Sequence, residues 1–119
     1  MRYKATMKQI TRTVAVDDLR GLLDGTALAY LGYVVDGEPG AARVSARRDG
    51  ERWFVTPPPT ISLDDGARAV LLIDDGEFYF ELRGVRVRGT LRDAGSGECE
   101  VVPEKVVTWD YSAMREKTP

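Results

Sequence analysis

Three polar side chains, Arg43, Ser45 and Arg47, alternate with the apolar side chains Val44 and Ala46. In a β-strand, residues two apart point to the same face, so this spacing places two guanidinium groups and one hydroxyl side by side. Guanidinium groups bind phosphates and carboxylates through paired hydrogen bonds. The pattern therefore predicts a surface that binds an anion. The alternative is an outer face on which the arginines pair with Asp and Glu.

A second group of hydroxyls, Thr56, Thr60 and Ser62, flanks the proline run 57–59. Hydroxyls and backbone N–H groups in such a turn can bind a phosphate. The three prolines remove three of these N–H donors, which favours a rigid turn as the alternative. The acidic pairs 64–65 and 74–75 are each followed directly by a glycine, so we interpret them as turn formers rather than as catalytic acids.

The absence of histidine excludes several kinds of chemistry. Ser-His-Asp and Cys-His hydrolases, histidine general bases and histidine-bound haem all need this residue. The single cysteine, Cys99, excludes an internal disulfide and a multi-cysteine metal site, so we predict no metal. Cys99 has no cation run beside it to lower its pKa, and we interpret it as a small buried hydrophobe. Any catalysis has to come from other polar residues or from a bound cofactor, and the sequence alone identifies no catalytic residue.

The charge balance argues against macromolecular partners of strong charge. Seventeen cations, thirteen of them arginine, stand against nineteen acids, for a net charge of −2. Such a chain has no overall attraction to nucleic acid or to a membrane. Arg83, Arg86 and Arg88 form a charged stripe next to Glu81, which we interpret as ion-paired surface. We therefore predict neither nucleic-acid nor membrane binding.

Length and composition predict one soluble domain. A chain of 119 residues buries roughly 65% of the surface that its unfolded form exposes. No apolar run approaches the roughly 18–20 residues of a membrane span. The basic start, residues 1–4, is not followed by an apolar signal segment, so we expect a cytoplasmic protein. The predicted domain is 1–119, with an N-terminal arm at 1–13 and a loose C-terminal tail at 111–119.

The apolar pattern predicts a mainly β protein with one short N-terminal helix. Leu19, Leu22 and Leu23 form an apolar stripe within a predicted helix over 14–23. The chain then alternates apolar runs with Asp-Gly turns, which are typical of antiparallel hairpins. The predicted strands are 27–35, 40–48, 51–56, 67–73, 77–91 and 99–110. We interpret them as a six-stranded antiparallel split barrel.

One irregularity in the long strand predicts a bulge. Apolar side chains lie at even positions before Gly84, as in Phe78 and Phe80, and at odd positions after it, as in Val85 and Val87. An extra residue near Arg83 and Gly84 restores a single apolar face and bends the strand. A bulge of this kind predicts a positive φ at Gly84.

The two tryptophans differ in their surroundings. Trp53 lies in the apolar run 53–55, which favours a place in the core. Trp109 lies near the end of the last strand, where its ring is available to an interface or a planar ligand.

Several segments together resemble the pyridoxamine 5′-phosphate oxidase-like split β-barrel superfamily. The opening hairpins are similar over Ala29–Pro39, Arg43–Gly50 and Trp53–Pro58. The hairpin Ala69–Gly76 followed by Tyr79–Gly89, with its Glu-Leu-Arg-Gly sequence, is similar to the actinobacterial flavin/deazaflavin oxidoreductase branch. The ending Val106–Asp110 is similar to the last strand of that branch.

The resemblance implies a homodimer that binds FMN or a deazaflavin in a cleft at the subunit interface. It implies an oxidoreductase acting on a small organic substrate. The phosphate is expected on the segment from Val55 to Ser62, and the ring along strand 42–46. The implied cofactor-binding residues are Arg43, Ser45, Arg47, Val55, Thr56, Thr60, Ser62 and Trp109. We expect Phe78 and Phe80 at the dimer interface.

One departure from the family pattern leaves a second hypothesis open. Segment 60–65 carries Asp64 and Asp65 where relatives usually carry Lys or Arg, and carboxylates repel a phosphate. The loop after Gly89 is also short. The alternative is a split barrel without a redox cofactor, which serves as a ligand-binding protein or a biosynthetic enzyme. In that case Asp64, Asp65 or Glu81 would anchor an apolar or cationic ligand.

Overall fold

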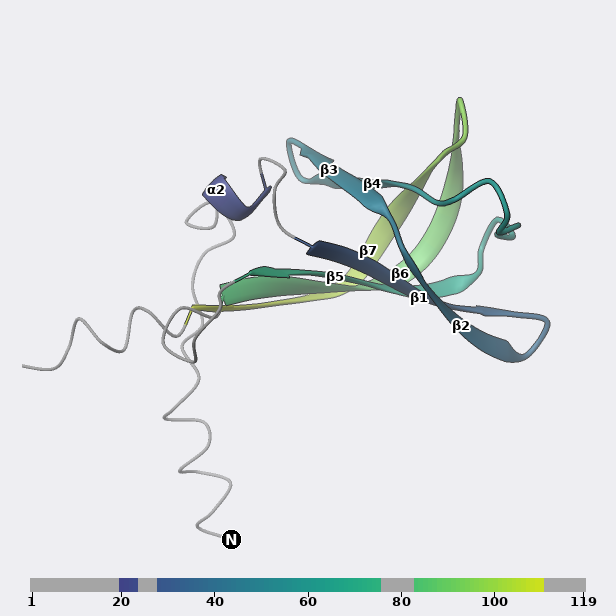
Figure 1. Ribbon diagram of the computed structural model, residues 1–119, viewed down its shortest axis with the longest axis horizontal. Helices are drawn as coiled ribbons and strands as arrows, with labels where there is room; N and C mark the ends of the chain where they lie inside the picture. Colours follow the sequence, from purple (N-terminus) through teal and green to yellow (C-terminus); the bar gives the residue numbers. More distant parts are fainter. Residues whose placement is uncertain (1–19, 24–27, 76–82, 111–119) are drawn as a thin grey trace, which may run out of the picture.

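The computed structural model describes residues 20–23, 28–75 and 83–110 (Figure 1). Within these ranges, one short helix, α2 (Arg20–Leu23), precedes seven strands. The strands are β1 (Leu28–Val35), β2 (Glu38–Arg43), β3 (Ser45–Asp49), β4 (Arg52–Thr56), β5 (Arg68–Asp75), β6 (Arg83–Gly95) and β7 (Glu98–Asp110).

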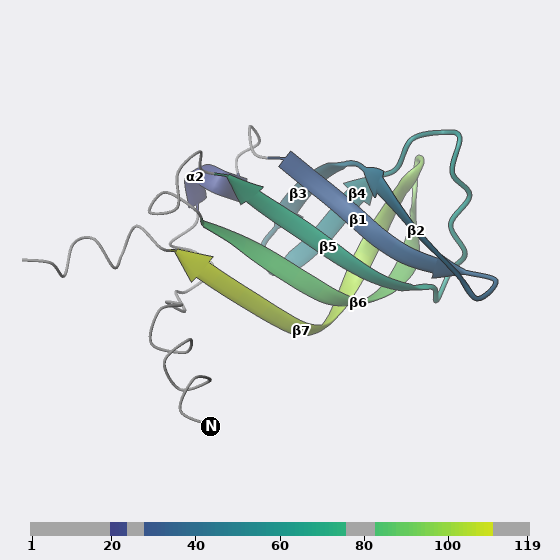
Figure 2. The same ribbon diagram turned by 60° about the horizontal axis from the view of Figure 1, so that its bottom comes forward.

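All seven strands form one antiparallel sheet in the order β2-β1-β5-β6-β7-β4-β3. The sheet curls, so that β3 and β4 face the layer of β1, β5 and β6 (Figure 2). β2 and β3 lie at opposite ends of the strand order, yet only Val44 separates them in the chain. The chain itself therefore closes the barrel at Val44, whose N–H donates to the carbonyl of Ala29 at 3.1 Å.

The predicted antiparallel split barrel is confirmed. The structure has seven strands rather than six because the predicted strand 40–48 is two strands, β2 and β3, that pair with different neighbours. No glycine or proline lies at the break at Val44, so the local alternation of side chains predicts one continuous strand. Of the predicted helix 14–23, the described residues contain α2 alone.

The Asp-Gly hairpin between β1 and β2 is confirmed. Val35 pairs with Glu38, which leaves Asp36 and Gly37 as a two-residue loop. Their φ angles are 54° and 78°, as a turn of the I′ type requires. This turn fixes the register in which β1 and β2 pair.

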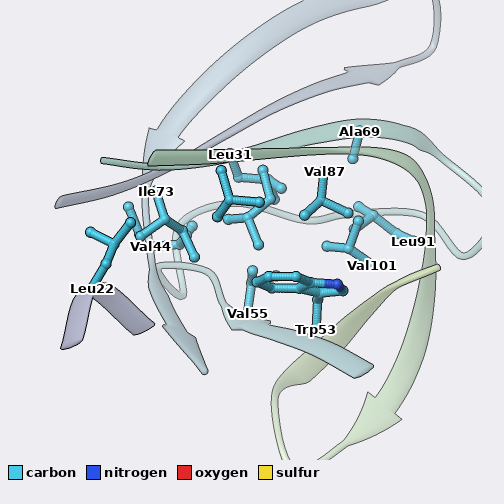
Figure 3. Packing of buried hydrophobic residues seen from close by; sticks show 13 residues of the cluster. Leu22, Leu31, Val44, Trp53, Val55, Ala69, Ile73, Val87, Leu91 and Val101 are labelled. Carbon is cyan, nitrogen blue, oxygen red and sulfur yellow. The ribbon is translucent and has the colours of Figure 1, made fainter. Parts of the chain in front are cut away.

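The core fills the inside of the curled sheet. Leu31, Leu71, Val87 and Val101 are fully buried. Figure 3 shows Leu31, Val87 and Val101 facing Trp53 and Val55 of β4. The prediction that Trp53 lies in the core is confirmed, since its exposed fraction is 2%. Leu22 of α2 packs at one end of this cluster, beside Val44 and Ile73 (Figure 3).

The predicted bulge at Arg83 and Gly84 is wrong. Pairing is regular there, because Gly84 lies opposite Asp74 on β5 and opposite Trp109 on β7. Gly84 also lacks a positive φ. Its small size has a steric reason: a Cβ at Gly84 would lie 2.5 Å from Cζ2 of Trp109 and 2.7 Å from the carbonyl oxygen of Ile73.

The strands bend instead where β7 contains Pro103. Arg88 pairs with Lys105 and Gly89 with Pro103, so Glu104 is the extra residue of a bulge. A proline has no N–H to donate to the ladder, which makes this position suited to an irregularity. The backbone of β7 approaches closely here, since a Cβ at Gly89 would clash with the carbonyl oxygen of Val102.

Several predictions concern residues outside the described ranges. They include the N-terminal arm 1–13, the C-terminal tail 111–119, Glu81 and the expected interface residues Phe78 and Phe80. Within the described ranges, no helix has the length and apolar character needed to cross a membrane.

Candidate anion-binding cleft

A cleft of about 280 Å³ opens where β2 passes into β3. Its polar wall consists of four side chains from the consecutive strands β2 and β3, namely Arg43, Ser45, Arg47 and Arg48. Its apolar wall consists of Leu22, Leu23, Ala29, Val44, Ala46 and Ile73. The structure thus brings together the three residues whose alternation predicted an anion-binding surface.

The break at Val44 explains why these side chains meet. Val44 points into the core and is 8% exposed, whereas Arg43 and Ser45 on either side of it are exposed. Because the chain leaves β1 for β4 at this residue, the exposed side chains line the edge of an opening rather than a flat sheet. α2 covers one side of the opening with its two leucines.

Arg43 is the arginine of the cleft lining that is available to a ligand among the described residues. It is exposed, and it forms no hydrogen bond or ion pair with any residue in the described ranges. It lies opposite Tyr30 across β1 and β2. An arginine in this state keeps all its N–H donors for an anion.

Arg47 is held by an acid. Its Nε and Nη2 donate to the two carboxylate oxygens of Glu98 at 2.7 and 2.8 Å. Its guanidinium also lies 4.2 Å from the centroid of the Phe54 ring. The hydrogen bond from Arg47 lowers the pKa of Glu98, and the same bond raises the pKa of Arg47. For Arg47, the predicted alternative of an ion-paired outer face is therefore the one that the structure shows.

A second set of ion pairs continues this face across β4, β6 and β7. Glu100 accepts hydrogen bonds from Arg52 at 2.8 and 3.0 Å and from Arg92 at 2.7 Å. These bonds hold the pKa of Glu100 down to about 2, well below the usual carboxyl value. The two sets of ion pairs enclose Phe54, which is 6% exposed although it lies outside the barrel core. These ion pairs hold β3, which forms one wall of the cleft, against its neighbouring strands.

Sequence reasoning missed Arg48 as a cleft residue. The alternation at 43, 45 and 47 assigned Arg48 to the opposite face of the strand. Arg48 lies opposite Trp53, with its guanidinium 5.2 Å from the indole ring, and it lines the cleft. A second cation directly after Arg47 is a clue in the sequence, but the direction of its side chain depends on where the barrel closes.

The remaining predicted site residues are spread over three places. Thr56 is exposed and pairs with Ser45, so it lies beside the cleft. Val55 is fully buried, so its side chain belongs to the core and cannot touch a ligand. Thr60 is exposed on the loop after β4, and Ser62 lines a different hollow.

That second hollow has a volume of about 320 Å³ and an acidic lining. It includes Asp64 and Asp65, the residues of the alternative hypothesis. Asp65 already has a structural role, because its Oδ1 accepts the backbone N–H of Asp93 at 2.9 Å. Cys99 also lines the hollow and is half-buried. Burial and the negative charges of Asp93 and Asp65 raise the pKa of its thiol, so it is not a reactive thiolate. No cluster of metal-ligating side chains occurs among the described residues.

Trp109 is not part of the cleft lining. It lies opposite Gly84 on β6, and its ring occupies the space that a side chain at that position would need. Within one copy of the chain, its contact is with the sheet.

Comparisons with known proteins agree on the architecture. No protein-family model matches the sequence, and no curated relative is found by sequence search. Solved structures do match. An FAD-binding protein from Mycobacterium smegmatis is 16% identical with a TM-score of 0.65, and the match covers 83% of this chain and 96% of that one.

Two further structures show the same arrangement of strands. A conserved hypothetical protein from Mycobacterium tuberculosis is 14% identical with a TM-score of 0.66, over 86% of this chain and 88% of that one. A candidate pyridoxamine 5′-phosphate oxidase from Corynebacterium glutamicum is 11% identical with a TM-score of 0.65, over 83% and 96%. The fold is the split barrel that this chain shares with these solved structures.

In this split barrel, the cleft at Val44 lies at the point where the chain passes from one end of the sheet order to the other. The opening is therefore a consequence of how the barrel closes. Its chemistry depends on the side chains that this sequence places there, of which Arg43 is the exposed cation without an acid partner in the described ranges.

Proposed function

We propose that this split barrel binds a flavin or deazaflavin cofactor that carries a phosphate, with Arg43 as the main contact to the anion. The observation that carries the proposal is the cleft at Val44, where the guanidinium of Arg43, unpaired with any residue that the structure describes, lies beside an apolar wall. Cofactors of this class combine an anionic group with a largely apolar planar ring. Among the similar structures, one is described as FAD-binding and another as a candidate pyridoxamine 5′-phosphate oxidase.

The residues present fit such a ligand. Arg43 donates to none of the described residues, and Arg48 adds a second positive charge on the same cleft. The hydroxyls of Ser45 and Thr56 lie on neighbouring strands and can donate to the polar edge of a ring. The cleft volume of about 280 Å³ holds a part of such a cofactor, with the rest lying over the exposed surface of β2 and β3.

The reaction that we propose is an oxidation or reduction of a small organic substrate. The cofactor would supply the hydride chemistry, which needs no histidine from the protein. The chain would bind the anion through Arg43, orient the ring through Ser45 and exclude water through Leu22 and Leu23. The choice between FMN and deazaflavin depends on the binding test below.

The test is a fluorescence titration of the full chain with FMN and, separately, with an oxidised deazaflavin. We expect saturable binding of one of them, weakened about tenfold or more in Arg43→Ala, because a charge-assisted hydrogen-bond pair is lost. The matched control is Arg68→Ala, which removes an exposed arginine on β5 away from the cleft. Absence of binding by both cofactors, or equal loss in both variants, would overturn the proposal.

We also propose that the chain forms a homodimer, with the cleft near the interface. Tyr30 and Val34 support it, because they are exposed by 39% and 41% on the outer face of β1. Light scattering at micromolar concentration tests this. A mass of about twice 13.2 kDa is expected, and a monomer would contradict it.

A ligand-binding protein without a redox cofactor is the second candidate. The acidic hollow favours it, because Asp64 and Asp65 adjoin the loop where a phosphate site would need cations. Failure of every flavin to bind, together with saturable binding of a cationic probe that Asp64→Asn abolishes, would support this candidate over the first.

A further inference from the structure

The outer face of β5, β6 and β7 has a positively charged hollow of about 280 Å³ that is separate from the cleft. Five residues line it. Val70 comes from β5, Arg86 and Arg88 come from β6, and Lys105 and Val107 come from β7. None of them lines the cleft at Val44.

The pairing of the strands places the three cations together. Arg88 lies directly opposite Lys105 on β7 and opposite Val70 on β5, and Arg86 lies opposite Val107. Arg86 and Arg88 are two residues apart, so they share one face of β6, and both are exposed. Like charges directly opposite each other across two strands destabilise the sheet. The arrangement therefore lowers the free energy of unfolding of the ligand-free chain.

None of the three cations is neutralised within residues 20–23, 28–75 and 83–110. Arg86, Arg88 and Lys105 form no ion pair or hydrogen bond with those residues. The outer surface formed by β3, β4 and β7 behaves differently, because Glu98 binds Arg47 there. The chain thus pairs arginines with acids on one part of its outer surface and leaves a compact group of cations around a hollow on another.

We propose that this hollow binds a small phosphorylated molecule. Arg88 and Lys105 bind its phosphate from two strands, and Arg86 extends the site to a second anionic oxygen group. Guanidinium groups match the geometry of phosphate oxygens, and an ammonium adds a mobile point charge. Val70 and Val107 contact the less polar part of the ligand.

The size and charge of the site favour a small molecule over a nucleic acid. Backbone binding of a nucleic acid uses a long track of cations and a basic surface. Here three cations surround one hollow on a chain with a net charge of −2. A pyrophosphate or a phosphate ester matches this local charge.

The experiment is a calorimetric titration of the full chain with inorganic pyrophosphate at low salt. We expect saturable binding that Arg88→Ala and Lys105→Ala each weaken about tenfold, since each removes a charge-assisted contact. The control Arg68→Ala removes the same charge from an exposed position on β5 outside the hollow, and we expect less than about a twofold change.

A second variant separates this site from the cleft. Arg43→Ala is expected to leave pyrophosphate binding unchanged, and Arg88→Ala to leave FMN binding unchanged. Pyrophosphate binding that depends on Arg43 and not on Arg88 would assign the anion to the cleft and overturn the proposal. So would absence of saturable binding, equal loss in Arg68→Ala, or a duplex DNA that binds more tightly than pyrophosphate.

Thermal unfolding gives an independent measurement. Lys105→Gln removes the repulsion with Arg88, so we expect the ligand-free variant to melt at a higher temperature than the native chain. Pyrophosphate is expected to raise the melting temperature of the native chain and to raise that of Lys105→Gln less. A variant that melts lower without ligand would show that Lys105 has a stabilising partner and would count against the site.

Discussion

Arg47 and Glu98 are 51 positions apart in the sequence and form an ion pair with two hydrogen bonds of 2.7 and 2.8 Å. The pair joins the edge strand β3 to the start of β7, on the outer side of the cleft. It holds the side chain of Arg47 over Phe54, so that, among the arginines that line the cleft, Arg43 is left without an acid partner in the described ranges.

Removal of Glu98 is expected to strengthen anion binding in the cleft. Glu98→Ala releases Arg47 and removes a carboxylate that competes with a phosphate, so we expect FMN to bind severalfold more tightly, on the order of 3–10-fold. Glu38→Ala is the control, because Glu38 is an exposed acid at the far end of β2. Fluorescence titration measures both. Weaker binding in Glu98→Ala would show that the ion pair positions Arg47 for the ligand.

Glu100 is expected to make stability depend on pH in the acid range. Its pKa is about 2 in the folded chain against an ordinary value of 4.5. The folded state therefore gains stability from Glu100 that is fully present above the ordinary value and is lost as the pH falls toward 2. Glu100→Gln should lose about 1–3 kcal/mol at pH 7 and should show a weaker decline with acid. Urea unfolding midpoints between pH 7 and pH 2 test this, and parallel curves for both chains would contradict it.

Gly89 is expected to tolerate no side chain. A Cβ there would clash with the backbone of Val102, and backbone cannot move aside as a side chain does. Gly89→Ala should lower the free energy of unfolding by about 3 kcal/mol or more. Gly32→Ala is the matched control, because its nearest neighbours would be 3.9 Å away, and it should change stability little. Equal melting temperatures for the two variants would refute the close approach of β6 and β7.

Gly84→Val is expected to lower stability through contacts rather than through backbone conformation. The new side chain would meet Trp109 and the carbonyl oxygen of Ile73, at a cost of about 1–3 kcal/mol. Adding Trp109→Ala should recover a part of the loss, since the carbonyl of Ile73 stays in place. Full recovery in the double variant would show that Trp109 is the only obstacle.

The sequence by itself determined the features that depend on neighbouring residues in the chain. Alternation placed Arg43 and Ser45 on one exposed face, and Asp36 with Gly37 specified a tight hairpin. The apolar surroundings of Trp53 were enough to assign it to the core. These predictions succeeded because strand alternation and turn conformation are set by steric rules over a few residues.

The tertiary structure alone decided the features that depend on which strands lie side by side. The break at Val44 has no local mark, and it exists because β2 and β3 pair with β1 and β4 at opposite ends of the sheet order. Two other features also depend on strand pairing. Residue 84 has to be a glycine because the Trp109 ring lies against it, and the side chain of Arg48 points into the cleft. The partner of Arg47 is Glu98, and no local rule connects two residues 51 positions apart. Contacts of this kind are fixed only when the sheet curls and closes, because register and closure set which distant side chains meet.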